Sequence, residues 1–234
     1  MSFDSKNVSA ILFDIDGTLF SSESIIGLVY QTAFEKFFER FPEKRELAVT
    51  PSLPAILDQI GRPVVEIFRN LVPDLSEEDR STISGLVLKD LLERIARGEG
   101  EHYAGVAETL RELHQRGYSF FAASNGRREY VEAILDYNGT RDWFAEVPAI
   151  EGPVIKNKND LVRSVVERHA LGPETAVLIG DRTSDRDAAR AGDLPFIACR
   201  FGHATSADEH AGAVAFLNRI GDLLELLPGK TVNS

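Results

Sequence analysis

The sequence predicts an α/β protein in which helices cover both faces of a parallel β-sheet, with a helical domain inserted near the N-terminus. Short apolar runs alternate with helical patterns over most of the chain, which is typical of parallel sheets. One long region near the N-terminus carries helical periodicity without strands. With 234 residues, 43% of them hydrophobic, the chain can form a core domain and a smaller second one.

The predicted strands are short apolar runs, and helical patterns separate most of them. The runs lie at 10–13, 118–123, 144–147, 176–179 and 195–199. The helical patterns lie at roughly 105–116, 128–138, 158–170, 183–191 and 216–227. Glycines at 117, 172 and 192 stand where helices would end before the next strand. This alternation indicates strands that all run in the same direction.

The region from 21 to 100 does not follow this alternation. Phe34, Phe37 and Phe38 lie on helical spacings, and prolines at 51, 54, 63 and 73 divide the region into short helices. A helical block of this size after the first strand indicates a separate domain. We therefore predict a core formed by residues 1–20 and 101–234, with residues 21–100 as a helical domain.

Charge and composition limit the classes of partner. The formal net charge of −11 disfavours binding to nucleic acid or to anionic lipid through bulk charge. Cys199 is the only cysteine, so no intrachain disulfide can form. No apolar stretch is long enough to span a bilayer, and the first residues lack a secretory signal pattern. We expect a soluble, cytoplasmic protein with no nucleic-acid or membrane partner.

Polar residues follow three of the predicted strands at their carboxyl ends, where functional groups of open parallel sheets gather. These residues are Asp14, Asp16, Ser124, Asn125, Asp181 and Asp185. Two lysines, Lys156 and Lys158, stand at the start of the helix before the third of these strands. We expect these side chains to meet at one edge of the sheet.

The predicted cluster suits phosphoryl transfer. Four carboxylates in one pocket repel each other and need a cation, and carboxylate and carbonyl oxygens suit magnesium. One carboxylate can then attack phosphorus to form an aspartyl-phosphate, while a neighbouring carboxylate acts as general acid and base. Ser124 and a lysine can stabilise the charge on the transferred phosphoryl group.

These segments resemble the motifs of the haloacid dehalogenase-like superfamily. Residues 13–19, with the sequence FDIDGTL, resemble the first motif, and residues 123–125 resemble the second. Lys158 is similar to the third motif and residues 180–185 to the fourth, in the same order. Residues 103–113 and the inserted helical block resemble the phosphoglycolate phosphatase-like branch. This resemblance implies a Rossmann-like core with a helical cap, which closes over small phosphate esters.

The resemblance also implies roles for the residues. Asp14 would be the nucleophile and a Mg²⁺ ligand, and Asp16 the general acid and base with its backbone carbonyl on the metal. Asp181 would be the second side-chain ligand, and Asp185, counted with the metal site, would orient bound water or Lys158. The residues expected to hold the phosphoryl oxygens are Ser124, Asn125 and Lys158.

Several alternatives stay open at this point. Lys156 fits the third motif on a different alignment, although Lys158 is preferred because Asp160 and Leu161 follow it as the usual helix start does. The leading function is a magnesium-dependent phosphatase for a small phosphorylated metabolite, such as phosphoglycolate, a sugar phosphate or a nucleotide. A phosphomutase of the same branch and a receiver-like phosphate-binding module are the alternatives.

Overall fold

The computed structural model describes residues 4–151 and 154–229 of the chain. The chain divides into two compact units. One comprises the residues up to Ser21 together with those from His102 onward, and the other is Ser22–Glu101. The first unit, called the core unit below, contains the main sheet, and the second, called the helical unit, consists almost entirely of helices. The chain thus leaves the core unit after its first strands and returns to it 80 residues later.

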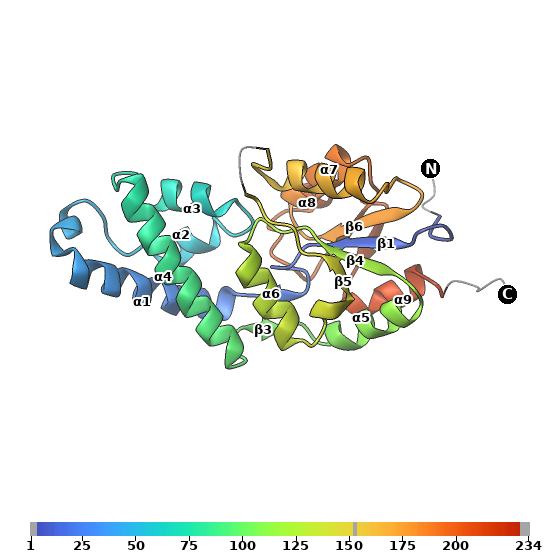
Figure 1. Cartoon of the computed structure of the whole chain (residues 1–234), viewed down its shortest axis with the longest axis horizontal. Helices are drawn as coiled ribbons and strands as arrows, with labels where there is room; N and C mark the ends of the chain where they lie inside the picture. Colours follow the sequence, from blue (N-terminus) through green and yellow to red (C-terminus); the bar gives the residue numbers. More distant parts are fainter. Residues whose placement is uncertain (1–3, 152–153, 230–234) are drawn as a thin grey trace. The chain divides into compact units, whose positions relative to one another are not determined.

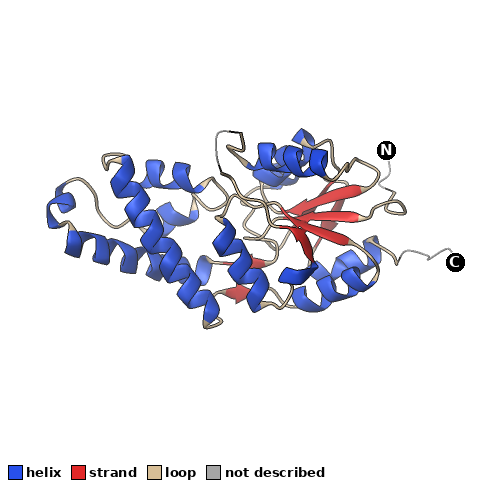
Figure 2. Ribbon diagram, viewed as in Figure 1, coloured by secondary structure: helices blue, strands red, loops and turns tan. Residues whose placement is uncertain are grey.

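The core unit is built on one parallel sheet of six strands in the order β5–β4–β1–β6–β7–β8. Figure 2 shows the sheet in red, with helices beside it. The strands are β1 (Ala10–Phe13), β4 (Ser119–Ala122), β5 (Phe144–Glu146), β6 (Ala176–Gly180), β7 (Phe196–Cys199) and β8 (Ala215–Leu217). Every neighbouring pair is parallel. The predicted α/β class with a parallel sheet is therefore confirmed.

Helices cover both faces of this sheet, as Figure 1 shows. One face carries α7 (Lys158–Arg168) and α8 (Thr183–Ala191), and the other carries α5 (Val106–Gln115), α6 (Arg128–Tyr137) and α9 (Leu223–Leu226). Successive strand residues point to opposite faces of a sheet. Leu12 therefore packs on one face, with α7 and α8. Its neighbour Phe13 meets Phe120, with ring centroids 5.5 Å apart. Burial on both faces explains why the strands are apolar without alternation.

The helix predicted at 216–227 is wrong in its first part. Residues Ala215–Leu217 form the edge strand β8, followed by a 3₁₀ turn at Ile220–Asp222 and the short helix α9. Val214 donates its backbone N–H to Phe196 O at 2.8 Å, and β8 pairs with β7. The apolar side chains of this segment suit a helix or an edge strand, and pairing with β7 decides between them.

The helical unit contains α1 (Glu23–Arg40), α2 (Leu53–Leu57), α3 (Val64–Leu71) and α4 (Glu77–Ala96), with a 3₁₀ turn at Pro42–Glu46. Helix α1 packs against α4, and Tyr30 stacks on Phe68 with ring centroids 5.7 Å apart. The predicted insertion of an all-helical domain is confirmed. Within residues 4–151 and 154–229, no helix combines the length and the apolar character needed to cross a membrane.

Two further strands, β2 (Phe20–Ser21) and β3 (Glu101–His102), pair in a separate two-stranded sheet. The central position of β1 in the main sheet sets the place of the functional groups. Asp14 donates its backbone N–H to Ile179 O on β6 at 2.9 Å, and Ala123 donates to Phe13 O at 2.7 Å. The carboxyl ends of β1, β4 and β6 therefore lie side by side.

Candidate active site

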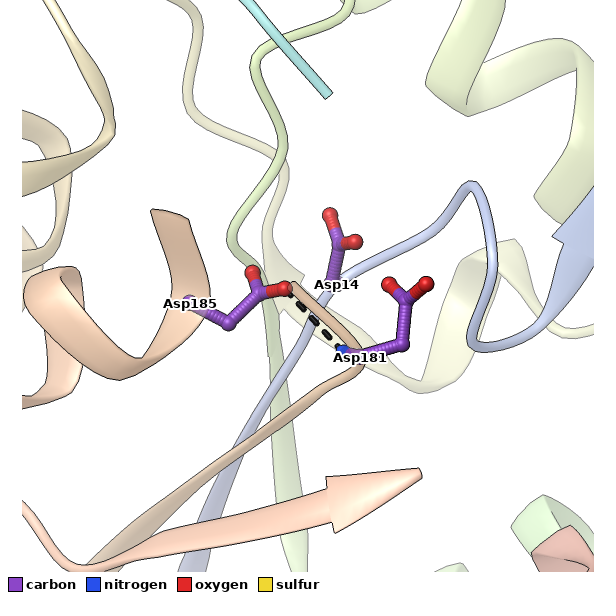
Figure 3. Close-up of side chains that lie close together, drawn as sticks. All are labelled: Asp14, Asp181 and Asp185. Carbon is purple, nitrogen blue, oxygen red and sulfur yellow. Dashed lines mark hydrogen bonds between the residues drawn. The ribbon is translucent and has the colours of Figure 1, made fainter. Parts of the chain in front are cut away.

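Three aspartates meet at the carboxyl ends of β1 and β6 (Figure 3). Asp14 directly follows β1, Asp181 directly follows β6, and Asp185 lies in the first turn of α8. One carboxylate oxygen from each lies within 4.8 Å of the other two. All three side chains are buried, and Asp181 and Asp185 are fully so. Sequence reasoning predicted all three, and the fold brings them together.

Lys158 reaches this cluster from the first residue of α7. Its Nζ donates to Asp14 Oδ1 at 2.7 Å and also to Asp185 Oδ1. The lysine is buried, whereas Lys156 is exposed and offers its backbone N–H to Asp160 Oδ2 at 3.1 Å. Of the two lysines left open by the sequence, Lys158 is thus the one whose ammonium group contacts the cluster.

Asp185 is held by both of its oxygens. Oδ1 accepts from Lys158, and Oδ2 accepts from the backbone N–H groups of Asp181 at 3.1 Å and Arg182 at 2.9 Å. A carboxylate is stabilised when it accepts hydrogen bonds from backbone N–H groups at a helix N-terminus. These bonds fix the first turn of α8 relative to the end of β6 and orient the Lys158 ammonium group.

Glycine is required where the chain turns away from β1. Gly17 adopts a φ of +91°, which L-residues with a side chain rarely adopt. A Cβ atom at this position would also overlap the Asp181 carboxylate. Gly202 approaches the same carboxylate and the Gly17 carbonyl so closely that a Cβ atom there would overlap both. The two glycines let two loops close around Asp181.

Burial shifts the protonation equilibria of the cluster. Burial raises the pKa of Asp14 from 3.8 to about 7, with a further rise from Asp185 and an opposing effect of Lys158. Burial, Asp185 and Asp14 together raise the pKa of Asp181 from 3.8 to about 8. Burial alone would lower the pKa of Lys158, but the two carboxylates it contacts raise it above its usual value. The lysine is therefore charged, and the carboxylates lack sufficient positive charge nearby.

The charge balance and the donor set fit a divalent cation. If all three carboxylates are ionised, the one ammonium group leaves two negative charges uncompensated (three minus one) in this cluster. Asp181 Oδ1 is buried and accepts no hydrogen bond within the described part of the chain. A buried carboxylate oxygen without a donor is costly unless a cation binds it. Asp14 and Asp181 could hold such an ion by their side chains.

Asp16 lies outside this three-carboxylate group. Its Oδ2 accepts a hydrogen bond of 2.9 Å from the hydroxyl of Tyr130 in α6, and its Oδ1 lies 3.5 Å from His203 Nε2. The Asp16 side chain is 20% exposed, more than that of the buried Asp14. The two carboxylates of the Asp-x-Asp pair thus occupy different environments, one among other charges and one at a more open position.

Ser124 and Asn125 follow β4, beside the end of β1. Ser124 is buried and accepts a hydrogen bond of 3.0 Å from Gly126 N, while Asn125 is half-buried. The backbone bond from Ala123 to Phe13 places Ser124 next to the strand end that carries Asp14. The hydroxyl and the backbone of this turn lie where the neighbouring strand ends meet.

Sequence reasoning did not identify the contact of Tyr130 with Asp16 or the role of the loop after β7. In that loop, His203 N donates to Asp181 Oδ2 at 2.5 Å, and His210 Nε2 lies 2.8 Å from Asp181 O. The position of His203 after the last predicted strand, at 195–199, was a usable signal. Tyr130 gave no such signal because it lies 114 residues from Asp16 in the chain.

Comparison with known proteins agrees with this geometry. Residues 8–193 match the haloacid dehalogenase-like hydrolase family. The phosphoglycolate phosphatase of Vibrio vulnificus (strain CMCP6) is 28% identical over 187 residues, covering 79% of this chain and 80% of that protein. Pyrophosphatase PpaX of Halalkalibacterium halodurans is 25% identical over 184 residues, covering 76% and 77%.

A solved structure described as a predicted phosphoglycolate phosphatase from Haemophilus somnus 129PT superposes with a TM-score of 0.80. It is 19% identical and covers 96% of this chain and 100% of that chain; at this identity the likeness shows the fold alone. The family match, which spans most of the chain, excludes the receiver-like alternative. The chain belongs to the haloacid dehalogenase-like hydrolase family, and it resembles that family's phosphoglycolate phosphatase-like branch, to which its phosphatase relatives point.

Proposed function

We propose that this chain is a Mg²⁺-dependent phosphatase that hydrolyses a small phosphomonoester through a phospho-aspartate at Asp14. The single observation that carries the proposal is the buried cluster of Asp14, Asp181 and Asp185 with the Lys158 ammonium group between two of them. When the three carboxylates are ionised, a divalent cation balances their excess negative charge, and carboxylate oxygens suit Mg²⁺. The family of the chain supports the same reaction class.

Each residue has a distinct task in the proposed reaction. The Asp14 carboxylate attacks phosphorus, the bond to the leaving oxygen breaks, and a phospho-aspartate forms. Asp16 donates a proton to the leaving oxygen and then accepts one from the water that attacks the phospho-aspartate. This second step releases inorganic phosphate and restores Asp14. When bound, Mg²⁺ neutralises the carboxylates and polarises the phosphoryl oxygens.

The remaining residues orient the phosphoryl group. Asp14 and Asp181 would hold the ion by their side chains and Asp16 by its backbone carbonyl, while Asp185 keeps Lys158 in place. Lys158, the Ser124 hydroxyl and Asn125 would donate hydrogen bonds to the phosphoryl oxygens. Asp14 and Ser124 follow neighbouring strands, which supports this arrangement. The helical unit is proposed to act as the cap that selects the substrate.

Two relatives suggest the first substrates to test. Phosphoglycolate is the leading candidate because the Vibrio vulnificus relative bears the name phosphoglycolate phosphatase. Inorganic pyrophosphate, a phosphoanhydride and not an ester, is the second because the Halalkalibacterium halodurans relative is named a pyrophosphatase. A phosphomutase would return the phosphoryl group from Asp14 to a sugar, so its turnover would depend on a bisphosphorylated sugar.

The test is a measurement of phosphate release from phosphoglycolate, pyrophosphate and several sugar phosphates, with Mg²⁺ and with EDTA. We expect release that requires Mg²⁺ and that is fastest with one small phosphate ester. Release that is undiminished by EDTA would contradict the metal assignment. Transfer of phosphate between sugar positions only after addition of a sugar bisphosphate would identify a mutase instead.

A further inference from the structure

Two side chains of the core unit lie beside the Asp16 carboxylate, Tyr130 through a hydrogen bond and His203 in close contact without one. Tyr130, in the first turn of α6, donates its hydroxyl to Oδ2 at 2.9 Å. His203, in the loop after β7, places Nε2 3.5 Å from Oδ1. Both side chains are buried: Tyr130 is 7% exposed and the side chain of His203 is 6% exposed. The carboxylate between them is the more accessible group, at 20%.

Both partners are themselves fixed by the fold. The Tyr130 ring packs against Phe20, with ring centroids 6.4 Å apart, and lies against the turn at Gly126. Both backbone polar groups of His203 are hydrogen-bonded. Its N–H donates to Asp181 Oδ2 at 2.5 Å, and its carbonyl accepts from Arg182 Nη1 at 3.1 Å. A side chain held by such fixed groups has few alternative rotamers.

We propose that Tyr130 and His203 are positioning residues that hold the Asp16 carboxylate where it can exchange a proton with the leaving oxygen. This inference rests on the proposed function, in which Asp16 is the general acid and base. Tyr130 and His203 act through Asp16 and not on the substrate itself. His203 contacts both carboxylates, because its backbone N–H donates to the proposed metal ligand Asp181 while its ring lies beside Asp16, so one loop positions both.

The proposal predicts a dependence on the leaving group. Protonation of the leaving oxygen matters most for a poor leaving group, so a misplaced Asp16 slows such a substrate more than one with a good leaving group. Phenyl phosphate and p-nitrophenyl phosphate have similar shapes, and phenolate is the poorer leaving group. The parameter to compare is kcat/KM, because it reports the step that forms the phospho-aspartate.

The experiment compares Tyr130→Phe with the wild type on both aryl phosphates in the presence of Mg²⁺. Tyr130→Phe keeps the ring that packs on Phe20 and removes only the hydroxyl. We expect kcat/KM for phenyl phosphate to fall about tenfold and that for p-nitrophenyl phosphate to fall less than about twofold. Equal falls for the two substrates, or no fall for either, would overturn the proposal.

His203 provides a second and independent arm. Substitution by leucine or glutamine keeps the backbone N–H that donates to Asp181, so these changes affect only the side chain. His203→Leu should show the same selective loss with phenyl phosphate, and His203→Gln should restore part of it, because an amide nitrogen can approach the position of Nε2. A loss of equal size in both His203 variants and for both substrates would show a merely structural role.

Two controls separate the possible failures. Tyr118→Phe removes another buried tyrosine hydroxyl, which donates to Pro228 O at 2.9 Å. Tyr118 precedes β4, at the end of the strand opposite to Ser124. This change should leave the ratio of kcat/KM for the two aryl phosphates unchanged. Asp14→Asn should abolish turnover of both substrates. If Asp14→Asn is inactive while Tyr130→Phe and His203→Leu show no selective loss, only the positioning proposal fails. If Asp14→Asn remains active, the proposed function fails.

Discussion

The surroundings of Lys158 would be unfavourable for a charged group without partners, and they are informative about function. Its ammonium group is buried among carboxylates, and burial of a charge is costly unless partners surround it. Asp14 and Asp185 supply these partners, and they raise the pKa of Lys158 above its usual value despite the burial. An ammonium group held against the proposed nucleophile can also stabilise the charge on a transferred phosphoryl group.

Replacement of Lys158 by methionine should strongly reduce activity. Methionine keeps most of the length of the side chain and removes the charge, so kcat with Mg²⁺ should fall at least about 100-fold. Steady-state kinetics with p-nitrophenyl phosphate checks this. Lys156→Met, at an exposed position two residues earlier, is the matched control and should keep nearly full activity. Similar losses in both variants would reject the assignment of Lys158.

At the scale of elements, the loop after β7 and the first turn of α8 form one hydrogen-bonded assembly around Glu209. Its carboxylate accepts from the backbone N–H groups of Thr205 at 2.8 Å and Thr183 at 3.2 Å, and from Arg182 Nε at 2.9 Å. Burial alone would raise the pKa of Glu209, but these donors lower it below the ordinary value of 4.5. The carboxylate thus ties the loop that carries His203 to the helix that carries Asp185.

The lowered pKa of Glu209 predicts a pH dependence of stability. A carboxyl group that is more acidic in the folded state stabilises the protein above its unfolded pKa, and this contribution is lost as pH falls through the folded value. Glu209→Gln should lower the free energy of unfolding at neutral pH by about 1–3 kcal/mol. The difference from the wild type should shrink below pH 4.5.

Urea unfolding at neutral pH and at several values below 4.5 measures this difference. Glu225→Gln changes an exposed glutamate of α9 in the same unit and is the control. A Glu209→Gln difference that stays constant or grows on acidification would show that its carboxylate is not the stabilising group.

The elements also show what a sequence can predict. Strands β1 and β6 are buried on both faces, so each appears as an uninterrupted apolar run ending at an aspartate, and Asp14 and Asp181 could be placed at neighbouring strand ends. The edge strand β8 is only three residues long and two of them are not buried. It therefore lacks the pattern of a core strand, and the same residues fit a helix.

Contacts between distant segments could not be predicted. The choice between Lys156 and Lys158 depends on which side chain points into the sheet edge, and spacing alone does not determine this. The hydrogen bond from Tyr130 to Asp16 depends on how α6 packs against the turn after β1. Such contacts follow from tertiary packing, and local residue patterns do not encode them.

At the scale of the whole molecule, the acidic net charge of −11 and the buried acidic cluster make stability dependent on cations. A ligand that binds only the folded state stabilises it by RT ln(1 + [L]/Kd), or about 2.7 kcal/mol at 100 times Kd. Burial and the neighbouring carboxylates raise the pKa of Asp181 to about 8, so ionisation of this carboxylate in the folded protein costs free energy unless a cation binds it. Removal of one carboxylate should relieve this repulsion.

Thermal unfolding with Mg²⁺ and with EDTA tests this dependence. The Tm of the wild type should rise by several degrees with Mg²⁺, about 2–4 °C for each kcal/mol in a chain of this length. Asp181→Asn should gain little from Mg²⁺ and should be at least as stable as the wild type in EDTA. Asp187→Asn, a more exposed position of α8, should respond like the wild type. Equal gains in all three proteins would mean that the ion binds elsewhere.

The identity of the nucleophile is the central claim, and the activity of Asp14→Asn tests it most directly. The measurement is kcat for p-nitrophenyl phosphate with Mg²⁺, for the wild type, Asp14→Asn and the control Asp187→Asn. Asparagine has nearly the shape of aspartate but cannot form the phospho-aspartate. Turnover by Asp14→Asn should therefore fall at least about 1,000-fold, while Asp187→Asn stays close to the wild type. A folded Asp14→Asn protein that retains substantial activity would contradict the mechanism.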